Sequence, residues 1–368
     1  RCSVGQHREF GQHAHGRHGD FAPASRTRDE VAWSSLVTPV KPWLWLSPAL
    51  AHKLSPVALN GISMFSNHTP AEWRGGKLGK FKFPQPLGVA GGVDKNAQNV
   101  RAWWSMGAGF IEIGTVTPKP QPGNPGVVVD RDLAHGALWN RLGFPSHGVE
   151  RVRARLSALQ RPFPTPLFAN IGKNATTSLD DASKDYVLLL ERLTGLVDGF
   201  VVNISSPNTA GLRELLKPAR LRDFLTPIMA ARPRGREPIL LKLSPDMSDA
   251  ELETALQISI ELDIDGWILT NTSQGLREGL SFPEGGGVSG RPLSSRSRQF
   301  LKNALNILGA NRRGRLVVSV GGVMSESDVF DRLALGADLV QVYSALIFEG
   351  PYFFRRVAAC PQANPNLR

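Results

Sequence analysis

Cysteine is scarce in this sequence, and long apolar runs and metal-ligand motifs are absent from it. Its only two cysteines, Cys2 and Cys360, lie near opposite ends of the 368 residues. Because they form no CxxC pattern, a disulfide scaffold and a cysteine-built zinc site are disfavoured, and a reducing compartment fits. No run of about 18 apolar residues occurs, which excludes a membrane-spanning helix. No His-Glu metal motif occurs, so we expect no metal cofactor.

Positive charge is in excess among the residues that are present. Lysine and arginine number 43 against 32 acidic residues, a net charge of +11. Such a balance indicates an anionic partner (nucleic acid, an acidic membrane surface or a phosphate-bearing ligand), or only an evenly basic surface. Hydrophobic residues make up 41% and charged residues 20%, close to a soluble globular average, so disorder over the whole length is excluded.

The N-terminal quarter differs in pattern from the rest of the chain. Residues 1–40 show no hydrophobic period and carry four of the eight histidines, and we expect a disordered basic, His-rich leader. Residues 41–75 are expected to form a helical extension. Within it, Ser47-Pro48 and Ser55-Pro56 each place an N-cap before a proline, which predicts two short helices. Their aliphatic residues, preceded by Trp43 and Trp45, suit either a membrane interface or a hairpin packed on its own domain.

Residues 76–360 show a regular alternation of strand-like and helix-like segments. Eight apolar, β-rich runs begin at residues 87, 110, 167, 199, 239, 266, 316 and 339. Helical stretches lie between many of them, and one opens with Ser248 and Glu251 at capping-box spacing. The pattern predicts an α/β fold, a (β/α)8 TIM barrel preceded by the small N-terminal helical extension. A doubly wound sheet is the alternative, but it usually has fewer strands, and no GxGxxG follows the first run.

Polar residues or glycines follow each predicted strand, at the end where barrels place their active sites. Glycines after the seventh strand and Tyr343-Ser344 after the eighth suit a phosphate group, and Gly290 can join them. Lys95 and Lys242, with no carboxylate partner nearby in sequence, suit a ligand that becomes anionic, such as a reduced flavin. Asparagines at several strand ends suit a planar, amide-rich substrate.

An ordered set of motifs carries a family resemblance. They are 88-GVAGGVDKN, 112-EIGTVTPKPQPGNP, 140-NRLGFPSHG, 170-NIGKN, 203-NISSPNTAGLR, 241-LKLSPD, 270-TNTS, 286-GGVSGRPL, 320-VGGV and 340-VQVYSALIFEGP. Over residues of about 46 to 352 the chain resembles the quinone-linked (class 2) dihydroorotate dehydrogenases. The resemblance implies an FMN-containing barrel that oxidises dihydroorotate to orotate in de novo pyrimidine (UMP) biosynthesis, with a membrane quinone as final electron acceptor.

The resemblance also implies roles for individual residues. Ser206 matches the catalytic base that removes the C5 proton while hydride passes from C6 to flavin N5, and Thr209 matches a threonine of the proton relay. Positions of the pyrimidine pocket are matched by Lys95, Asn140, Arg141, Leu142, Gly143, Phe144, Asn203, Asn208, Asn271 and Thr272. FMN contacts are matched by Ala90, Gly91, Gly92, Thr115, Asn170, Asn203, Lys242, Thr270, Gly290, Gly322, Tyr343 and Ser344.

Residues 46-LSPALAH resemble the class 2 extension, which docks on a membrane and forms a quinone tunnel that His52 and Arg131 would face. The implied protein is a monomer on the cytoplasmic face of a bacterial membrane, or on the mitochondrial inner membrane in a eukaryote. Three departures from the family pattern, 126-GVVVDRD, Leu142 and Pro145, bear on the quinone type and the lid.

The alternative function is that of a class 1-type enzyme or another FMN barrel with a soluble acceptor. Ser206 and the N-terminal extension are evidence against this alternative. A nucleic-acid-binding flavin barrel would also explain the charge, but no basic run interleaved with aromatics occurs.

Overall fold

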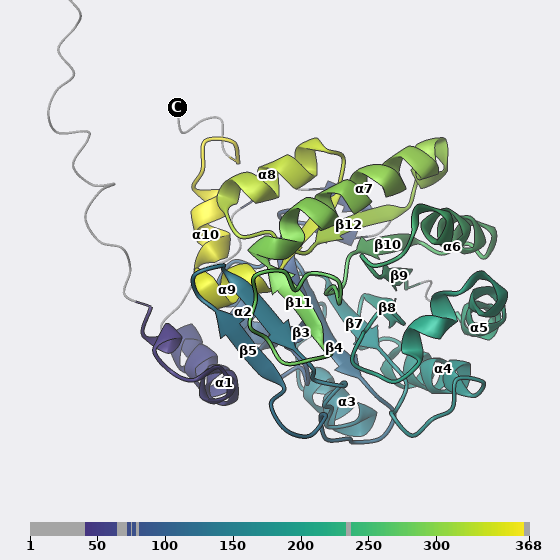
Figure 1. Ribbon diagram of the computed structural model, residues 1–368, viewed down its shortest axis with the longest axis horizontal. Coiled ribbons are helices and arrows are strands. Elements are labelled where there is room, and N and C mark those ends of the chain that lie inside the picture. Colours follow the sequence, from purple (N-terminus) through teal and green to yellow (C-terminus); the bar gives the residue numbers. More distant parts are fainter. Residues whose placement is uncertain (1–40, 65–71, 75, 79–80, 233–236, 364–368) are drawn as a thin grey trace, which may run out of the picture. The chain divides into compact units, whose positions relative to one another are not determined.

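The computed structural model describes residues 41–64, 72–74, 76–78, 81–232 and 237–363 (Figure 1). The leader expected over residues 1–40 lies outside these residues, as do residues 65–71 and 75 of the expected extension. From Lys41 onward the chain forms one compact unit.

Eight parallel strands close into a barrel, as the alternating pattern predicted. Each barrel strand pairs with the next barrel strand along the chain, and the last pairs with the first through Val340 opposite Leu87. Nearly all strand residues are buried, because helices cover the outside and side chains fill the inside. The strands are β3 (Leu87–Asp94), β4 (Ile111–Val116), β7 (Leu167–Ile171), β8 (Gly199–Asn203), β9 (Ile239–Leu243), β10 (Gly266–Leu269), β12 (Leu316–Val320) and β13 (Leu339–Val342).

Helices follow the strands and form the outer layer (Figure 1). The predicted capping box at Ser248 is confirmed, because its hydroxyl accepts from the Glu251 N–H and the Glu251 carboxylate accepts from the Ser248 N–H. The helices are α2 (Val100–Ser105), α3 (Val149–Ser157), α4 (Ala182–Leu193), α5 (Pro218–Ala230), α6 (Asp249–Glu261), α7 (Ser294–Leu308), α8 (Glu326–Ala334), α9 (Ser344–Phe348) and α10 (Phe353–Ala358). Short 3-10 turns are η2 (Leu212–Leu216), η3 (Arg291–Leu293) and η4 (Gly309–Arg312).

Two small sheets lie outside the barrel wall. The hairpin β1 (Gly76–Leu78) and β2 (Phe81–Phe83) precedes the first barrel strand. It brings Phe83 into the barrel interior, where the ring lies 5.9 Å from Phe110 and 6.5 Å from Phe168, centroid to centroid. A three-stranded antiparallel sheet combines β5 (Val129–Asp132), β6 (Ala137–Asn140) and β11 (Gly287–Gly290). This second sheet carries Asn140 and Ser289, two residues of the candidate site.

The extension contains one long helix where the sequence predicted two short ones. After η1 (Pro42–Leu44), α1 runs from Pro48 to Met64 with Pro56 inside it. Pro56 has no N–H for the carbonyl of His52, but the Ser55 hydroxyl donates to that carbonyl at 3.0 Å. The hydroxyl replaces the missing backbone donor, so the helix continues where a second N-cap was expected. The first predicted cap is present: the Ser47 hydroxyl accepts from the Leu50 N–H at 3.4 Å.

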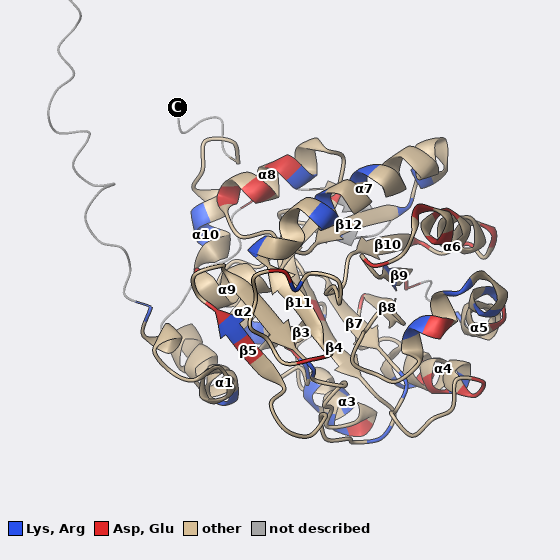
Figure 2. Cartoon of the chain, in the orientation of Figure 1, with Lys and Arg blue, Asp and Glu red and all other residues tan. Residues whose placement is uncertain are grey.

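Specific hydrogen bonds attach the extension to the barrel. The Trp43 indole donates to the carbonyl of Ile347 at 2.7 Å, and Lys41 pairs with Glu349 at 2.9 Å. The Asn99 amide donates to the carbonyl of Pro56 at 2.8 Å. Figure 2 shows positions of charged residues along the outer helices, whereas α1 carries few. None of the helices in the described ranges is long and apolar enough to cross a membrane.

Candidate active site

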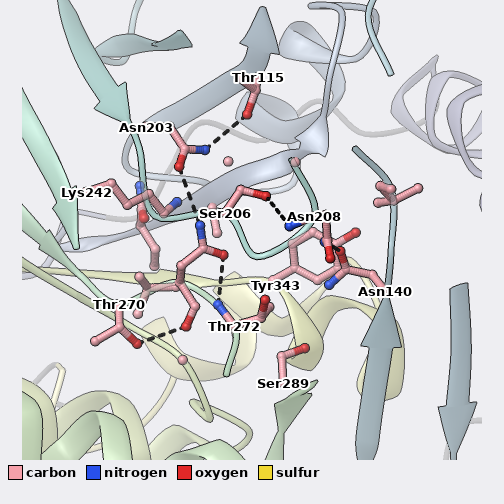
Figure 3. A pocket seen from close by; sticks show the side chains of 18 of the residues that line it. Thr115, Asn140, Asn203, Ser206, Asn208, Lys242, Thr270, Thr272, Ser289 and Tyr343 are labelled. Carbon is pink, nitrogen blue, oxygen red and sulfur yellow. Dashed lines mark hydrogen bonds between the residues drawn. The ribbon is translucent and has the colours of Figure 1, made fainter. Parts of the chain in front are cut away.

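A large cavity opens at the carboxyl ends of the barrel strands (Figure 3). Its volume is about 950 Å³ including the part open to solvent, which is the size of a cofactor or ligand site. Strand ends, the loops that follow them and the sheet of β5, β6 and β11 all contribute lining residues. The cavity therefore lies where the sequence placed the site.

Buried amides and hydroxyls form the floor of the cavity at the ends of β4, β7 and β8. The Asn203 amide nitrogen donates to Thr115 Oγ1 at 3.2 Å and to Asn170 Oδ1 at 3.0 Å. Thr115 donates its own hydroxyl to the same Asn170 oxygen at 2.7 Å. On the other side, Asn203 Oδ1 accepts from Ser205 Oγ at 3.2 Å. These bonds fix which side of each amide is a donor, so the floor presents a defined hydrogen-bonding pattern to a ligand.

Ser206 lies in the loop after β8 and faces the cavity (Figure 3). The residue is 5% exposed, and Oγ accepts from the Asn208 N–H at 3.2 Å. The Asn208 side chain donates to Asn140 Oδ1 at 2.7 Å, which joins this loop to β6 across the cavity. A nearly buried hydroxyl beside amide groups can exchange a proton with a bound molecule while water is largely kept away.

Lys242, which has no carboxylate partner nearby in sequence, pairs in the structure with one that is 130 positions away. Its ammonium lies 3.2 Å from Glu112 Oε1, and both side chains are buried. Glu112 also accepts from the Asn170 amide and from Gln341 Nε2, each at 2.6 Å. Fully buried charges require such pairing, because an isolated ion in the interior is very costly. The pair leaves the lysine charge locally balanced at the base of the site.

Lys95 lies at the wall of the cavity and connects it to the extension helix. Its ammonium donates to the carbonyl of Gly92 at 2.8 Å and lies 2.9 Å from His52 Nε2 on α1. Burial lowers the pKa of Lys95 to about 8, and the neighbouring Asp94 partly opposes this shift. The charge of Lys95, and then burial, lowers the pKa of His52 to about 4. At neutral pH a charged lysine therefore donates to a neutral imidazole.

The structure brings most of the sequence-predicted residues to one cavity. Those that line it are Ala90, Gly91, Gly92, Lys95, Thr115, Asn140, Leu142, Gly143, Phe144, Asn203, Ser206, Asn208, Lys242, Thr270, Asn271, Thr272, Gly322, Tyr343 and Ser344. Five others lie outside the lining. Asn170 supports the floor through its hydrogen bonds to Thr115 and Asn203 without lining the cavity itself, and Gly290 ends β11 and packs against the carbonyl of Gly136. Arg141 donates to the carbonyl of Pro125 at 3.1 Å. The tunnel candidate His52 contacts Lys95, and Arg131 donates to backbone carbonyls of the extension, including Leu44 at 2.7 Å.

The sequence reading missed several residues of the site. The lining residues that it did not name are Ser289, Leu293, Val320, Val323 and Gln341, whereas Gly321 had been expected among the phosphate-binding glycines and Pro145 near the lid. Gln341 and Glu112 had a visible signal, since each is a polar residue inside an otherwise apolar strand, where burial demands a partner. The others are apolar or small and carry no such signal.

Three buried polar atoms of lining residues have no hydrogen-bond partner among the residues that the structure describes. They are Gln341 Oε1, Asn208 Oδ1 and Thr272 Oγ1. A buried acceptor without a partner is costly, so these atoms indicate that a ligand with N–H or O–H donors belongs in the cavity. A flavin ring and a dihydropyrimidine both supply such donors, and the donor set fits them.

The family model for dihydroorotate dehydrogenase matches residues 76–360, which is most of the chain. The chain belongs to the dihydroorotate dehydrogenase family. The dihydroorotate dehydrogenase (quinone) of Thermus thermophilus is 43% identical over 279 residues, covering 75% of this chain and 78% of the relative. The one from a Marinomonas species is 36% identical over 333 residues, 86% of this chain and 94% of the relative. This is a family of flavin-dependent enzymes.

A solved structure of a dihydroorotate dehydrogenase confirms the fold. The crystal structure of the enzyme from Eimeria tenella, in complex with ferulenol, superimposes with a TM-score of 0.75 at 31% identity. The match covers 87% of this chain and 91% of the other. The predicted TIM barrel and family resemblance are therefore both confirmed.

Proposed function

We propose that this chain carries out its family's reaction with FMN held in the barrel-top cavity and Ser206 as the base. That reaction is the quinone-dependent oxidation of dihydroorotate to orotate in pyrimidine biosynthesis (EC 1.3.5.2). The observation that carries the proposal is that one cavity joins Ser206 and four asparagine or threonine side chains at one end to glycine turns at the other. These four are Asn140, Asn208, Asn271 and Thr272.

The FMN ring would lie over the floor of Thr115, Asn170 and Asn203, with Lys242 and Gln341 at its side. The phosphate group would lie at the glycines that end β12 and at Ser344, since parallel barrels commonly bind phosphate after strands seven and eight. When bound, the flavin accepts the hydride that leaves C6 of dihydroorotate. The remaining proposed contacts of FMN are Ala90, Gly91, Gly92, Thr270, Gly290, Gly322 and Tyr343.

Ser206 would take the proton from C5 of the substrate. A serine hydroxyl is a weak base, so its environment has to stabilise the charge that develops on Oγ. The Asn208 N–H donates to that oxygen at 3.2 Å, and burial strengthens this hydrogen bond. Thr209 is also buried, and its Oγ1 has no partner among the described residues, so it is available to relay the proton onward.

Purified protein is expected to hold one FMN per chain without a covalent link. Under anaerobic conditions dihydroorotate is expected to reduce this flavin and bleach the flavin absorbance. The reason is the fit of the floor, the lysines and the glycine turns to a phosphorylated flavin. Absorbance spectra before and after adding dihydroorotate, with flavin identified after heat release, test this expectation. Protein that binds no flavin after reconstitution contradicts the proposal.

Orotate, the anionic product, is expected to bind more weakly as pH rises through about 8. The folded-state pKa of Lys95 is lowered to about 8, so its positive charge is present below that pH and lost above it. One unit above the pKa about a tenth of the lysine stays protonated, so affinity should fall up to about tenfold between pH 7 and pH 9. His52, with a pKa of about 4, stays neutral over this range. Orotate titrations followed by flavin absorbance give the measurement.

Lys95→Arg is the matched control for the pH profile, because arginine keeps its charge at pH 9. Orotate affinity in this variant should be nearly flat between pH 7 and pH 9. The same alkaline loss in the variant as in the natural protein would assign the effect to another group.

The extension of residues 41–75 is proposed to bring the barrel of residues 76–360 to a membrane as a peripheral protein. On α1, Leu50, Leu54, Val57 and Met64 are 43–80% exposed and recur at helical spacing, while Leu59 and Ile62 pack on the core. An exposed apolar stripe on a helix with few charges is typical of an interfacial helix. His52 of this helix contacts Lys95 at the cavity wall, and Arg131 donates to the Leu44 carbonyl just before the helix, which supports their proposed place near a quinone path.

A further inference from the structure

One buried cation near the cavity has no part in the site described so far. Arg332 of α8 is 1% exposed, and no carboxylate of the described residues forms an ion pair with it. Its guanidinium bonds instead to neutral oxygens at the end of β12 and the start of α7. Nη2 donates to the Ser294 carbonyl and to Ser297 Oγ, each at 2.9 Å, and to the Gly321 carbonyl at 3.3 Å. Nη1 donates to Ser319 Oγ at 3.4 Å.

These bonds fix the direction of the turn that lines the cavity. The Gly321 carbonyl also accepts from Ser297 Oγ at 2.6 Å, so it points to the side away from the cavity. In a trans peptide the N–H points opposite to the carbonyl, and the Gly321–Gly322 bond is trans. The Gly322 N–H therefore points away from Arg332, on the side where Gly322 lines the cavity. No acceptor for this N–H occurs within the described part of the chain.

The turn packs too closely on α7 to take any other residue. A Cβ on Gly322 would lie 2.3 Å from the backbone of Ser294, and its φ of +66° is a conformation that side chains disfavour. The same Ser294 carbonyl binds Arg332, so the guanidinium joins α8, α7 and the end of β12 at the point where the turn begins.

The charge on Arg332 is maintained under physiological conditions. Burial lowers its pKa to about 10, and the carboxylates of Asp328 and Asp331 partly oppose this shift, so the guanidinium stays protonated at neutral pH. A desolvated positive charge without an ion-pair partner leaves the turn in a positive field, which favours an anion on the open side of the turn.

We propose that Arg332 is a positioning residue for the phosphate end of the flavin site. Its guanidinium holds the Gly321–Gly322 turn with an N–H toward the cavity, and its charge attracts the phosphate group of FMN through that turn. The inference rests on the proposed FMN cofactor. It predicts that Arg332 strengthens the binding of FMN but not that of riboflavin, which has the same ring without the phosphate.

The test compares FMN with riboflavin on full-length protein from which flavin has been removed. Titrations followed by flavin fluorescence give both dissociation constants for Arg332→Gln, Arg332→Lys and the natural protein. Arg332→Gln should weaken FMN binding roughly 10- to 100-fold, the scale of losing charge-assisted hydrogen bonds, and change riboflavin binding less than about twofold. Arg332→Lys keeps the charge and should lose less than about tenfold for FMN. Inorganic phosphate should compete with FMN in the natural protein and much less in Arg332→Gln.

Arg298→Gln is the matched control. Arg298 also joins α7 to α8, through Asp331 at 2.6 Å, but it lies on the outer surface and should leave both affinities unchanged. Ser297→Ala provides a milder variant if Arg332→Gln fails to fold, and it should weaken FMN selectively by a few-fold. Equal weakening of FMN and riboflavin would make Arg332 a merely structural residue, and unchanged FMN binding would also overturn the inference. A natural protein that binds no FMN would instead refute the proposed cofactor, and this inference with it.

Discussion

Ser206→Ala is expected to slow reduction of the bound flavin by dihydroorotate at least about a hundredfold, the usual scale for losing a general base. The alanine fits the same space, and among the described residues Ser206 Oγ accepts only from the Asn208 N–H, so fold and flavin affinity should stay intact. Anaerobic stopped-flow mixing with dihydroorotate measures the rate, and a flavin titration checks the site.

Two further variants, one at Ser206 and one at the adjacent Ser205, test whether Ser206 is the base. Ser205→Ala removes an adjacent hydroxyl that is fully buried and bonds to Asn203 and Asn271 beneath the cavity, so it should cost much less than Ser206→Ala. Ser206→Cys should keep some activity with a shifted pH profile, because a thiol can also take the proton but ionises at lower pH. A near-natural rate for Ser206→Ala would place the base elsewhere.

Much of the barrel was predictable from local sequence patterns. Apolar runs bounded by glycine and polar residues predicted all eight strands, since a strand buried on both faces reads as a continuous apolar segment. The position of the site followed from fold geometry: strand ends far apart in the chain, such as Asn203 and Asn271, meet at one rim of a closed barrel. These inferences needed only periodicity and the direction of the strands.

The remaining features depend on contacts between distant residues. Lys242 and Glu112 are 130 positions apart and meet only because β9 and β4 face each other inside the barrel, so no local pattern indicated their pairing. The single helix α1 continues past Pro56, where the Ser55 hydroxyl donates to the carbonyl of His52, although the sequence context of Ser55 also suits an N-cap. From the sequence alone, Arg332 would be assigned to the exposed face of a helix. Only the tertiary structure shows that it is buried beneath the glycine turn.

The second large effect concerns the apolar stripe of α1. Leu54→Asp combined with Val57→Asp should weaken binding to anionic vesicles at least about a hundredfold, because two exposed apolar side chains that would enter the membrane become charges that the surface repels. Turnover with a long-chain quinone should fall at least about tenfold for the same reason. Both side chains point away from the barrel core, so reduction by dihydroorotate and reoxidation by a small soluble dye should remain close to normal.

Ala250→Asp combined with Gln257→Asp on α6 gives a control with the same change in charge. Both positions are exposed, and in Figure 1 α6 lies across the barrel from α1, so vesicle binding and quinone turnover should change little. Vesicle sedimentation and quinone-dependent absorbance assays measure the two effects, and the thermal midpoint checks that each variant is folded. Equal losses in both double variants would show that net charge, rather than the α1 stripe, governs membrane binding. If the α1 variant were folded and kept full vesicle binding and quinone turnover, the stripe would not be the membrane contact. A soluble electron acceptor, reached without the extension, would then explain the activity better than a membrane quinone.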